Sequence, residues 1–210
     1  MSDALAAGLG VLGIQADGDT QVRLRAYLAL LEKWNRTHNL TAISERERMI
    51  THHVLDSLSV LPHLPAGASV RIADVGSGGG LPGIPLAVCR REWRVTLIES
   101  SRKKAAFLAQ AAIELSLSNV DVVAERVERY RPPVALDIAI SRAYASLSTF
   151  ATQAQHLIAP GGWLAAMKGV HPHDEIAALP SGVRVTEVIA LHVPGIQARR
   201  HLILMQGAAA

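Results

Sequence analysis

The stretch Asp74-Val75-Gly76-Ser77-Gly78-Gly79-Gly80 places four glycines directly after a short apolar segment, and it decides the fold class expected for this chain. Glycine lets the backbone turn tightly and approach a ligand closely. The following residues, 81–85 (Leu-Pro-Gly-Ile-Pro), lead into a predicted helix at 83–91, and the first N–H groups of a helix can bind a ligand. A strand, a glycine-rich turn and a helix in this order are typical of a nucleoside-binding α/β unit.

From residue 70 onward, segments typical of strands alternate with segments typical of helices. We predict strands at 70–75, 94–99, 120–124, 136–141 and 163–167, and helices at 83–91, 102–117 and 146–158. Strands separated by helices need crossover connections, which favour a mainly parallel sheet with helices on both faces. The segments 183–191 and 201–205, joined through Pro194-Gly195, predict an antiparallel C-terminal hairpin. Residues 67–210 are therefore expected to form one doubly wound, Rossmann-like α/β domain.

Residues 1–66 are expected to form an N-terminal helical extension. Apolar residues in 23–34 recur at the spacing of one helix face, and a second helix is predicted over 44–61 with Ser44 and Glu47 as a capping box. Several polar residues of this extension have roles that the sequence leaves open; they are Asn35, His38, Asn39, His53 and Asp56. For the first three, capping or stabilising a turn is the simplest interpretation, and for the last two a buried His–Asp pair.

Composition limits the class of protein. Half of the 210 residues are hydrophobic and 19% are charged, which indicates a folded chain. The single cysteine, Cys89, cannot form an internal disulfide and favours a reducing, cytoplasmic compartment. No apolar run approaches the roughly 20 residues that span a bilayer, so no membrane association is expected. His171 and His173 have Asp174 and Glu175 beside them, but helix capping is the better interpretation, and we expect no metal.

Two acidic residues near the glycine-rich turn distinguish between nucleoside cofactors. Glu99 ends the second predicted strand, 23 residues after Gly76, where its carboxylate can accept hydrogen bonds from ribose hydroxyls. Asp74 would repel a pyrophosphate but suits a ligand that carries an ammonium group. We therefore expect S-adenosylmethionine, held by Asp74, Gly78 and Glu99, in a class I methyltransferase fold. An NAD(P)-dependent oxidoreductase is the alternative.

Five segments in a fixed order carry a narrower resemblance. They are 33–41 (KWNRTHNLT), 52–58 (HHVLDSL), 74–85, 140–143 (ISRA) and 200–202 (RHL). This order resembles the bacterial 16S ribosomal RNA guanine-N7 methyltransferase family, also called the glucose-inhibited division protein B family. The resemblance implies methyl transfer from S-adenosylmethionine to one guanine N7 of 16S rRNA, within a small ribosomal subunit or its precursor, by a monomer. Carried over by position, it implies cofactor contacts at Gly76, Leu81, Val127, Glu128 and Arg142.

Guanine N7 carries a lone pair and no proton, so no general base is expected and the enzyme's work is alignment and desolvation. Arg142 and Tyr144 follow the fourth predicted strand and are the candidates for positioning the guanine. Arg142 would orient the cofactor or donate to the O6 edge. Tyr144 would stack on the base, with a core tyrosine as the equal alternative. A non-catalytic RNA-binding assembly factor with this fold is a further alternative.

The charge balance permits a polyanionic partner without requiring one. There are 21 Lys and Arg against 18 Asp and Glu, with no polybasic arm, so any RNA surface must be assembled by folding. Lys168, Arg199 and Arg200 are the candidates for RNA phosphate contacts. A solvated surface charge is the equal alternative for each of them.

Overall fold

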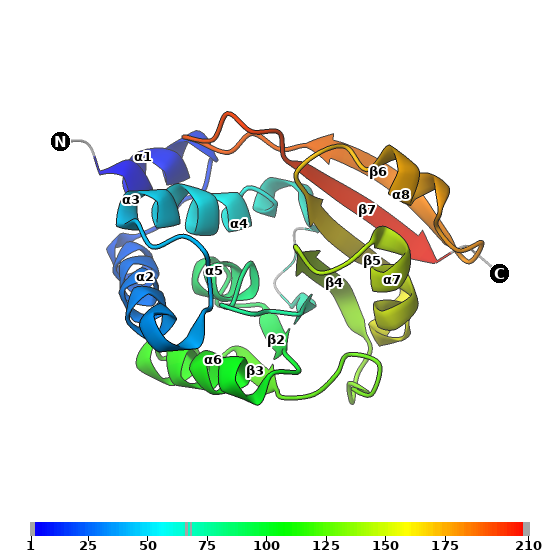
Figure 1. The fold of residues 1–210 in the computed structure, drawn as a ribbon, viewed down its shortest axis with the longest axis horizontal. Coiled ribbons are helices and arrows are strands. Elements are labelled where there is room, and N and C mark those ends of the chain that lie inside the picture. The colour runs from blue at the N-terminus through cyan, green and yellow to red at the C-terminus, as the bar shows by residue number, and fades with distance from the viewer. Residues whose placement is uncertain (1–2, 66, 68, 208–210) are drawn as a thin grey trace.

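One seven-stranded sheet organises the chain, in a computed structural model that describes residues 3–65, 67 and 69–207 (Figure 1). Its strands stand in the order β3-β2-β1-β4-β5-β7-β6. Their bounds are β1 Arg71–Val75, β2 Arg94–Ile98, β3 Val120–Val123, β4 Leu136–Arg142, β5 Ile158–Lys168, β6 Val183–Ala190 and β7 His201–Gly207. Strands β1 to β5 pair in parallel, while β7 is antiparallel to both β5 and β6. The doubly wound sheet and the C-terminal hairpin are confirmed.

Helices cover both faces of this sheet because its strands are apolar on both sides. In β1, Ile72 packs with a core cluster that includes Phe107 of α6, whereas the next residue, Ala73, packs with Phe150 of α7. Successive strand side chains point to opposite faces, so each face acquires its own core. The helices that follow the strands are α5 Gly83–Cys89, α6 Arg102–Glu114, α7 Leu147–Ala154, the 3₁₀ turn Gln155–Leu157 and α8 His173–Ala177.

The extension packs against helices α5 and α6, on one side of the sheet. It contains α1 Ala4–Val11, α2 Gly18–His38, α3 Arg46–Met49, a π-helical turn Ile50–Leu55, α4 Asp56–Leu58 and a 3₁₀ turn Leu61–His63. Leu24 and Leu31 of α2 belong to the same buried cluster as Ile72 of β1, so one core runs through both parts. Residue 66, the last residue of the expected extension, lies outside the described residues. Within the described part of the chain, no helix is long and apolar enough to cross a membrane.

The predicted helix over 44–61 and its capping box are wrong in detail. The helical run starts after Glu45, no side-chain cap bonds are formed there, and a π-helical turn interrupts it at Ile50–Leu55. A π turn inserts one extra residue, and such turns recur at functional sites. The 3.6-residue hydrophobic pattern of the sequence does not reveal this insertion. The residue that contacts the turn, Arg142, lies far away in the chain.

Two further boundaries differ from the prediction. Strand β5 starts at Ile158, five residues early, since Pro160-Gly161-Gly162 forms an irregular stretch within the strand and not a turn before it. Helix α6 stops at Glu114 because Ser116 takes a left-handed conformation with φ of 52°. The predicted cap of α7 is confirmed: Ser146 accepts a hydrogen bond from the Thr149 N–H at 3.1 Å.

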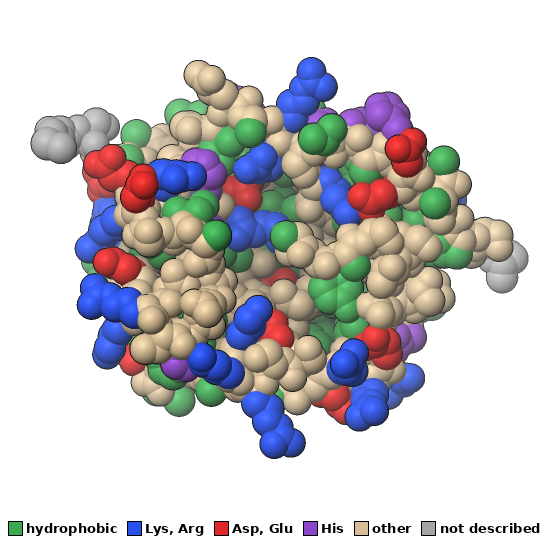
Figure 2. Space-filling view, in the orientation of Figure 1, with side chains coloured by type: hydrophobic (Ala, Val, Ile, Leu, Met, Phe, Trp, Pro, Cys, Tyr) green, Lys and Arg blue, Asp and Glu red, His purple; other side chains and the backbone are tan. Residues whose placement is uncertain are grey.

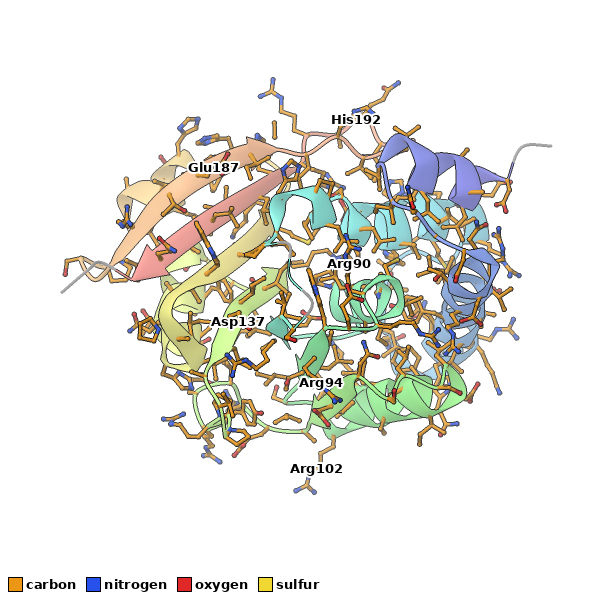
Figure 3. All side chains as sticks on the ribbon, turned by 180° about the vertical axis from the view of Figure 1, so that it is seen from behind. Arg90, Arg94, Arg102, Asp137, Glu187 and His192 are labelled. Atoms are coloured by element: carbon orange, nitrogen blue, oxygen red, sulfur yellow. The ribbon has the colours of Figure 1, made fainter. Side chains whose placement is uncertain are left out.

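The parallel strands point the same way, which fixes the edge at which a site can form. Seen from behind, Arg94 and Asp137 mark the amino ends of β2 and β4 (Figure 3). The carboxyl ends of β1, β2 and β4 meet at the opposite edge, and ligands of open α/β sheets bind at such an edge. The glycine-rich turn lies there, between β1 and α5.

Candidate functional site

The glycine-rich turn is built from backbone geometry that glycine alone adopts readily. Gly76, Gly78 and Gly80 have φ values of 72°, 56° and 85°. A Cβ on Gly76 would collide with the Tyr144 ring, and one on Gly80 would collide with Ile84. Three of the four glycines predicted to permit a tight turn therefore do so.

Asp74 lies beneath this turn and is fully buried. Its Oδ2 accepts a hydrogen bond from the Gly83 N–H at 2.9 Å, while its Oδ1 has no partner among the described residues. Burial raises the pKa of Asp74 to about 7. A buried carboxyl with an orphaned oxygen fits a cationic group of a ligand, bound directly or through water.

Glu99 ties the end of β2 to the turn. Its two oxygens accept hydrogen bonds from the Gly78 N–H at 2.9 Å and the Ser101 N–H at 2.8 Å, and the residue is buried. Gly78 therefore takes part through its backbone. The contact of Glu99 with ribose hydroxyls stays a prediction, and the structure adds that this carboxylate orders the glycine turn.

A small cavity of about 100 Å³ opens beside the turn and brings several predicted residues together. Its lining includes Gly76, Val127, Glu128 and Tyr144. The Tyr144 hydroxyl donates to Gln153 Oε1 at 2.6 Å, and the Gln153 amide donates to Glu128 Oε1 at 2.7 Å. The Tyr144 ring thus lies over Gly76, on the side where the cofactor contacts were expected and away from the expected guanine. Gln153 was missed because its partners come from two other segments.

Leu81 occupies a different environment. Its side chain is buried in the main core and its N–H donates to the Ser77 carbonyl at 3.1 Å. A cofactor contact at this position would therefore use its backbone carbonyl.

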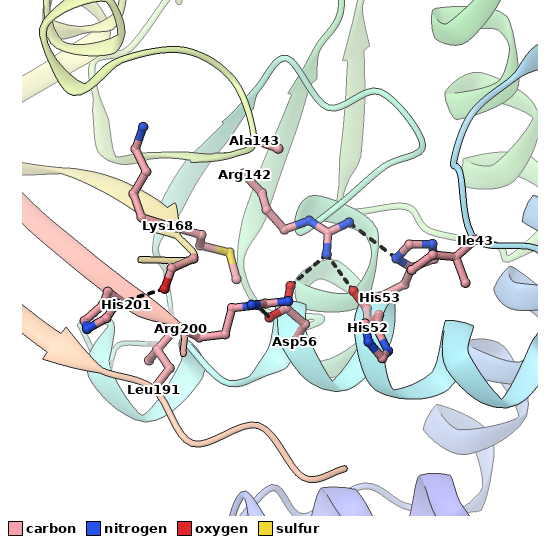
Figure 4. Close-up of a pocket in the computed structure, with 12 residues that line it drawn as sticks. Ile43, His52, His53, Asp56, Arg142, Ala143, Lys168, Leu191, Arg200 and His201 are labelled. Atoms are coloured by element: carbon pink, nitrogen blue, oxygen red, sulfur yellow. Dashed lines mark hydrogen bonds and ion pairs between the residues drawn. The ribbon is translucent and has the colours of Figure 1, made fainter. Parts of the chain in front are cut away.

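A larger cavity of about 420 Å³ lies between the extension and the sheet. The space-filling view shows a hollow in the middle of this face, with Lys and Arg side chains around it (Figure 2). Arg142 projects into the cavity from the end of β4 and donates to Asp56 Oδ2 and to the His52 carbonyl, each at 2.8 Å (Figure 4). Arg200 donates to the other Asp56 oxygen at 3.0 Å. The expected His53–Asp56 pair is therefore wrong: the aspartate is shared by two arginines, which hydrogen-bond better to both its oxygens.

Ala143 separates the two cavities. Its φ of 53° is rare for a residue with a side chain. This turn sends Arg142 into the larger cavity and Tyr144 into the smaller one. The two residues expected to act together on the guanine therefore line different cavities.

His53 is a neutral member of the larger cavity. Burial, and then the nearby Arg142 guanidinium, lower the pKa of His53 to about 4. A hydrogen bond of 2.7 Å joins its Nε2 to Thr41 Oγ1, and its Nδ1 lies 3.5 Å from Arg142 Nη2. Because the ring is neutral, the charges of Arg142 and Arg200 are opposed by the single carboxylate that they share, Asp56.

The three predicted RNA-contacting cations are not equivalent. Lys168 Nζ donates to the Ala145 carbonyl and to Glu175 Oε2, each at 2.8 Å, so it orders the chain after β4. Arg200 is committed to Asp56. Arg199 is exposed, and its side chain has no polar partner among the described residues, which leaves it available for a phosphate.

The polar cluster after α2 is structural. Asn39 caps this helix in a left-handed conformation, and the Asn35 side chain bonds the Thr41 backbone twice, each at 2.9 Å. His38 packs against the Trp34 ring at 4.5 Å between centroids. Across the described residues, no group of three or more His, Cys, Asp or Glu is arranged to hold a metal ion.

Comparison with known proteins places the chain in a family. Residues 20–203 match the family described as rRNA small subunit methyltransferase G. This chain belongs to that family. Proteins named ribosomal RNA small subunit methyltransferase G from Nitrosospira multiformis and Aromatoleum aromaticum are each 53% identical to it. The first alignment covers 97% of this chain and 96% of the relative, the second 96% and 97%. The family resemblance read from the five sequence segments is confirmed.

Solved structures share the fold. A DhpI complex with S-adenosylhomocysteine superposes with a TM-score of 0.57 at 15% identity, over 93% of this chain and all of the other. The mitomycin 7-O-methyltransferase MmcR gives 0.62 at 14% identity, over 77% and 56%. The family is S-adenosylmethionine-dependent, and this chain's site fits that cofactor: an unpartnered Asp74 oxygen lies beneath a turn that only glycines can form.

Proposed function

We propose that this protein transfers the methyl group of S-adenosylmethionine to N7 of one guanosine in 16S ribosomal RNA. The observation that carries the proposal is that consecutive residues after β4 line two cavities: Arg142 and Ala143 line the one that holds Asp56, and Tyr144 lines the one beside the glycine-rich turn. Family membership supports rRNA as the substrate class and removes the reason to prefer an NAD(P)-dependent oxidoreductase.

When bound, S-adenosylmethionine supplies an electrophilic methyl group. Asp74 is placed to attract its ammonium group, and Glu99 and Glu128 are carboxylates that can accept from hydroxyl and amine groups of the nucleoside. Val127 and Gly76 line the apolar side of the same cavity. These assignments rest on the buried carboxyl of Asp74 and on the residues that line the smaller cavity.

This chain's residues need not move a proton at the target atom. Guanine N7 presents its lone pair in the plane of the ring, so reaction requires that the lone pair point at the methyl carbon and that water be excluded. Arg142, fixed by Asp56 and the His52 carbonyl, is held on the substrate side of Ala143. His53 is neutral near pH 7, so it adds no positive charge to the wall of the larger cavity.

The extension of residues 1–66 contributes Ile43, His52, His53 and Asp56 to the wall of the larger cavity, so we propose that it completes the substrate site of the domain formed by residues 67–210. We further propose that the substrate is an assembled or maturing small ribosomal subunit in the cytoplasm, met by a monomeric enzyme. The modest net charge of +3 supports recognition of a structured particle over tight binding to any RNA.

The test uses small subunits and naked 16S rRNA from cells that lack this enzyme, incubated with labelled S-adenosylmethionine. Mass spectrometry of the digested rRNA should show one 7-methylguanosine, formed faster on small subunits than on naked 16S rRNA. Label on the guanine amino group, or on protein, would contradict the proposal. Cofactor binding without any transfer would instead support the assembly-factor alternative.

A further inference from the structure

The reacting atom alone cannot select the base. Adenine also carries an N7 lone pair, so an enzyme that methylates guanine must read other atoms. Beside N7, guanine presents the O6 acceptor and then the N1–H and exocyclic amine donors. Adenine presents an amine where guanine has O6 and lacks the N1–H. A guanine-selecting cavity therefore needs a donor next to a carboxylate or an equivalent pair of acceptors.

Asp56 is the one carboxylate among the described residues that line the larger cavity. Only 4% of the residue is exposed, yet it reaches the cavity beside the Arg142 and Arg200 guanidiniums (Figure 4). Each of its oxygens receives one arginine hydrogen bond. An ionised carboxylate offers about four lone-pair sites, so two remain for a ligand.

The π-helical turn explains how this carboxylate is presented. Hydrogen bonds in a π turn run from residue i to i+5, which changes the faces on which successive residues lie. In this chain, the His52 carbonyl within the turn accepts from Arg142, and Asp56 follows directly after the turn. The turn and Arg142 together hold a donor and an acceptor side by side at the cavity wall.

We propose that Asp56 selects guanine at the target position, an inference that rests on the proposed function. Its carboxylate accepts hydrogen bonds from N1–H and the exocyclic amine, and Arg142 donates to O6. Adenine at this position would place an amine against the guanidinium and leave the carboxylate without a donor, which a buried polar site rejects. A phosphate fits less well than a base, because a phosphate has no hydrogen-bond donor for the Asp56 carboxylate, whereas guanine supplies two.

The experiment removes one group from each partner of the proposed contact: the exocyclic amine of the base and the carboxylate of Asp56. Small subunits carrying guanosine or inosine at the target position are methylated by wild-type protein and by Asp56→Asn. Inosine keeps N7, O6 and N1–H but lacks the exocyclic amine. Asp121→Asn, an exposed aspartate on β3, is the matched control and should behave as wild type.

We expect wild-type kcat/KM to fall roughly 10- to 100-fold on inosine, the range set by one specific base contact. Asp56→Asn should be slow on guanosine and should lose most of the discrimination between the two bases. S-adenosylmethionine binding by the variant reports that it is folded. If Asp56→Asn does not fold, the wild-type rates on guanosine and inosine still test whether the exocyclic amine is recognised.

Three results would overturn the inference. They are equal wild-type rates on guanosine and inosine, unchanged discrimination in folded Asp56→Asn, and tighter RNA binding by that variant, which would indicate a phosphate site. Absence of methyl transfer by wild-type protein to the guanosine substrate would instead contradict the proposed function. Failure of the inference and failure of the proposed function are therefore distinguishable.

Discussion

Arg142 and Asp56, which lie 86 residues apart in the sequence, form a hydrogen-bonded ion pair of 2.8 Å with side chains that are 18% and 5% exposed. The pair joins the end of β4 to the helical extension, and Arg200 extends it to β7. Substrate cavity and tertiary structure therefore depend on the same charges, so substitutions here should affect both stability and catalysis.

Replacing Arg142 by alanine should lower the free energy of unfolding by about 3 kcal/mol, because a buried carboxylate loses a partner. Urea unfolding followed by circular dichroism measures this effect. Asp56→Ala combined with Arg142→Ala should be less destabilising than the sum of the single changes by about 1 kcal/mol or more. Additive changes would show that the two side chains are not energetically coupled.

Arg142→Lys separates charge from geometry at the same position. Lysine keeps the positive charge but lacks the planar fork that meets Asp56 and the His52 carbonyl together. We expect near-normal S-adenosylmethionine binding and a loss of methyl transfer of about 100-fold, measured with labelled cofactor. A variant with wild-type transfer would remove Arg142 from the substrate site.

Asp74 should make stability and cofactor binding depend on pH in opposite directions. Burial raises the pKa of Asp74 from 3.8 to about 7, so the folded state binds a proton between these values that the unfolded state does not. Its contribution to stability is therefore complete below about pH 4 and is lost as pH rises through 7. Relative to wild type, Asp74→Asn should gain about 2 to 4 kcal/mol between pH 4 and pH 8.

The same group should strengthen cofactor binding as it ionises. Wild-type affinity for S-adenosylmethionine should rise between pH 6 and pH 8, because the charged carboxylate attracts an ammonium group, and Asp74→Asn should lack this rise. Calorimetric titration at several pH values compares the two proteins. Identical pH profiles would show that Asp74 serves the fold alone.

The sequence predicted those parts of the molecule that local patterns determine. The glycine turn, the alternation of strands and helices, the Ser146 cap and the hairpin through Pro194-Gly195 all depend on residues close in the chain. Asp74 and Glu99 could be singled out because they lie at the ends of predicted strands, whereas Val127 was implied only by the family resemblance; their contacts with a cofactor stay predictions.

What the sequence did not predict depends on contacts between distant segments. The π turn before Asp56 carries the His52 carbonyl to which Arg142, 90 residues further along the chain, donates, and no local periodicity reveals it. The left-handed Ala143, which divides Arg142 from Tyr144 between two cavities, is likewise invisible in composition. Lys168 was expected at an RNA phosphate, but α8 brings Glu175 to it.

Gly76→Ala should weaken cofactor binding strongly. Its φ of 72° is strained for alanine by about 1 to 2 kcal/mol, and the added methyl collides with the Tyr144 ring. Adding Tyr144→Ala should recover part of the lost affinity, because it removes the collision but not the strain. Gly18→Ala, which has open space around it and no positive φ, is the control and should leave binding unchanged. Equal affinities of the single and double variants would rule out the contact.

Lys168 and Arg199 should respond differently to salt, although both were predicted to contact RNA. Lys168 donates to Ala145 and Glu175 in the folded protein, so Lys168→Ala should disturb the segment after β4 and lower kcat while the salt dependence of RNA binding stays unchanged. Arg199 is exposed, so Arg199→Ala should leave kcat at saturating RNA intact. Arg199→Ala should also reduce the slope of log K against log salt by about 0.7 to 0.9, which corresponds to the loss of one phosphate contact.

Filter binding from 50 to 200 mM salt measures the slopes of the two variants, because phosphate contacts change the affinity markedly over this range. A reduced slope for Lys168→Ala would show that its ammonium leaves Glu175 to reach RNA in the complex, and an unchanged slope for Arg199→Ala would take that residue off the RNA surface.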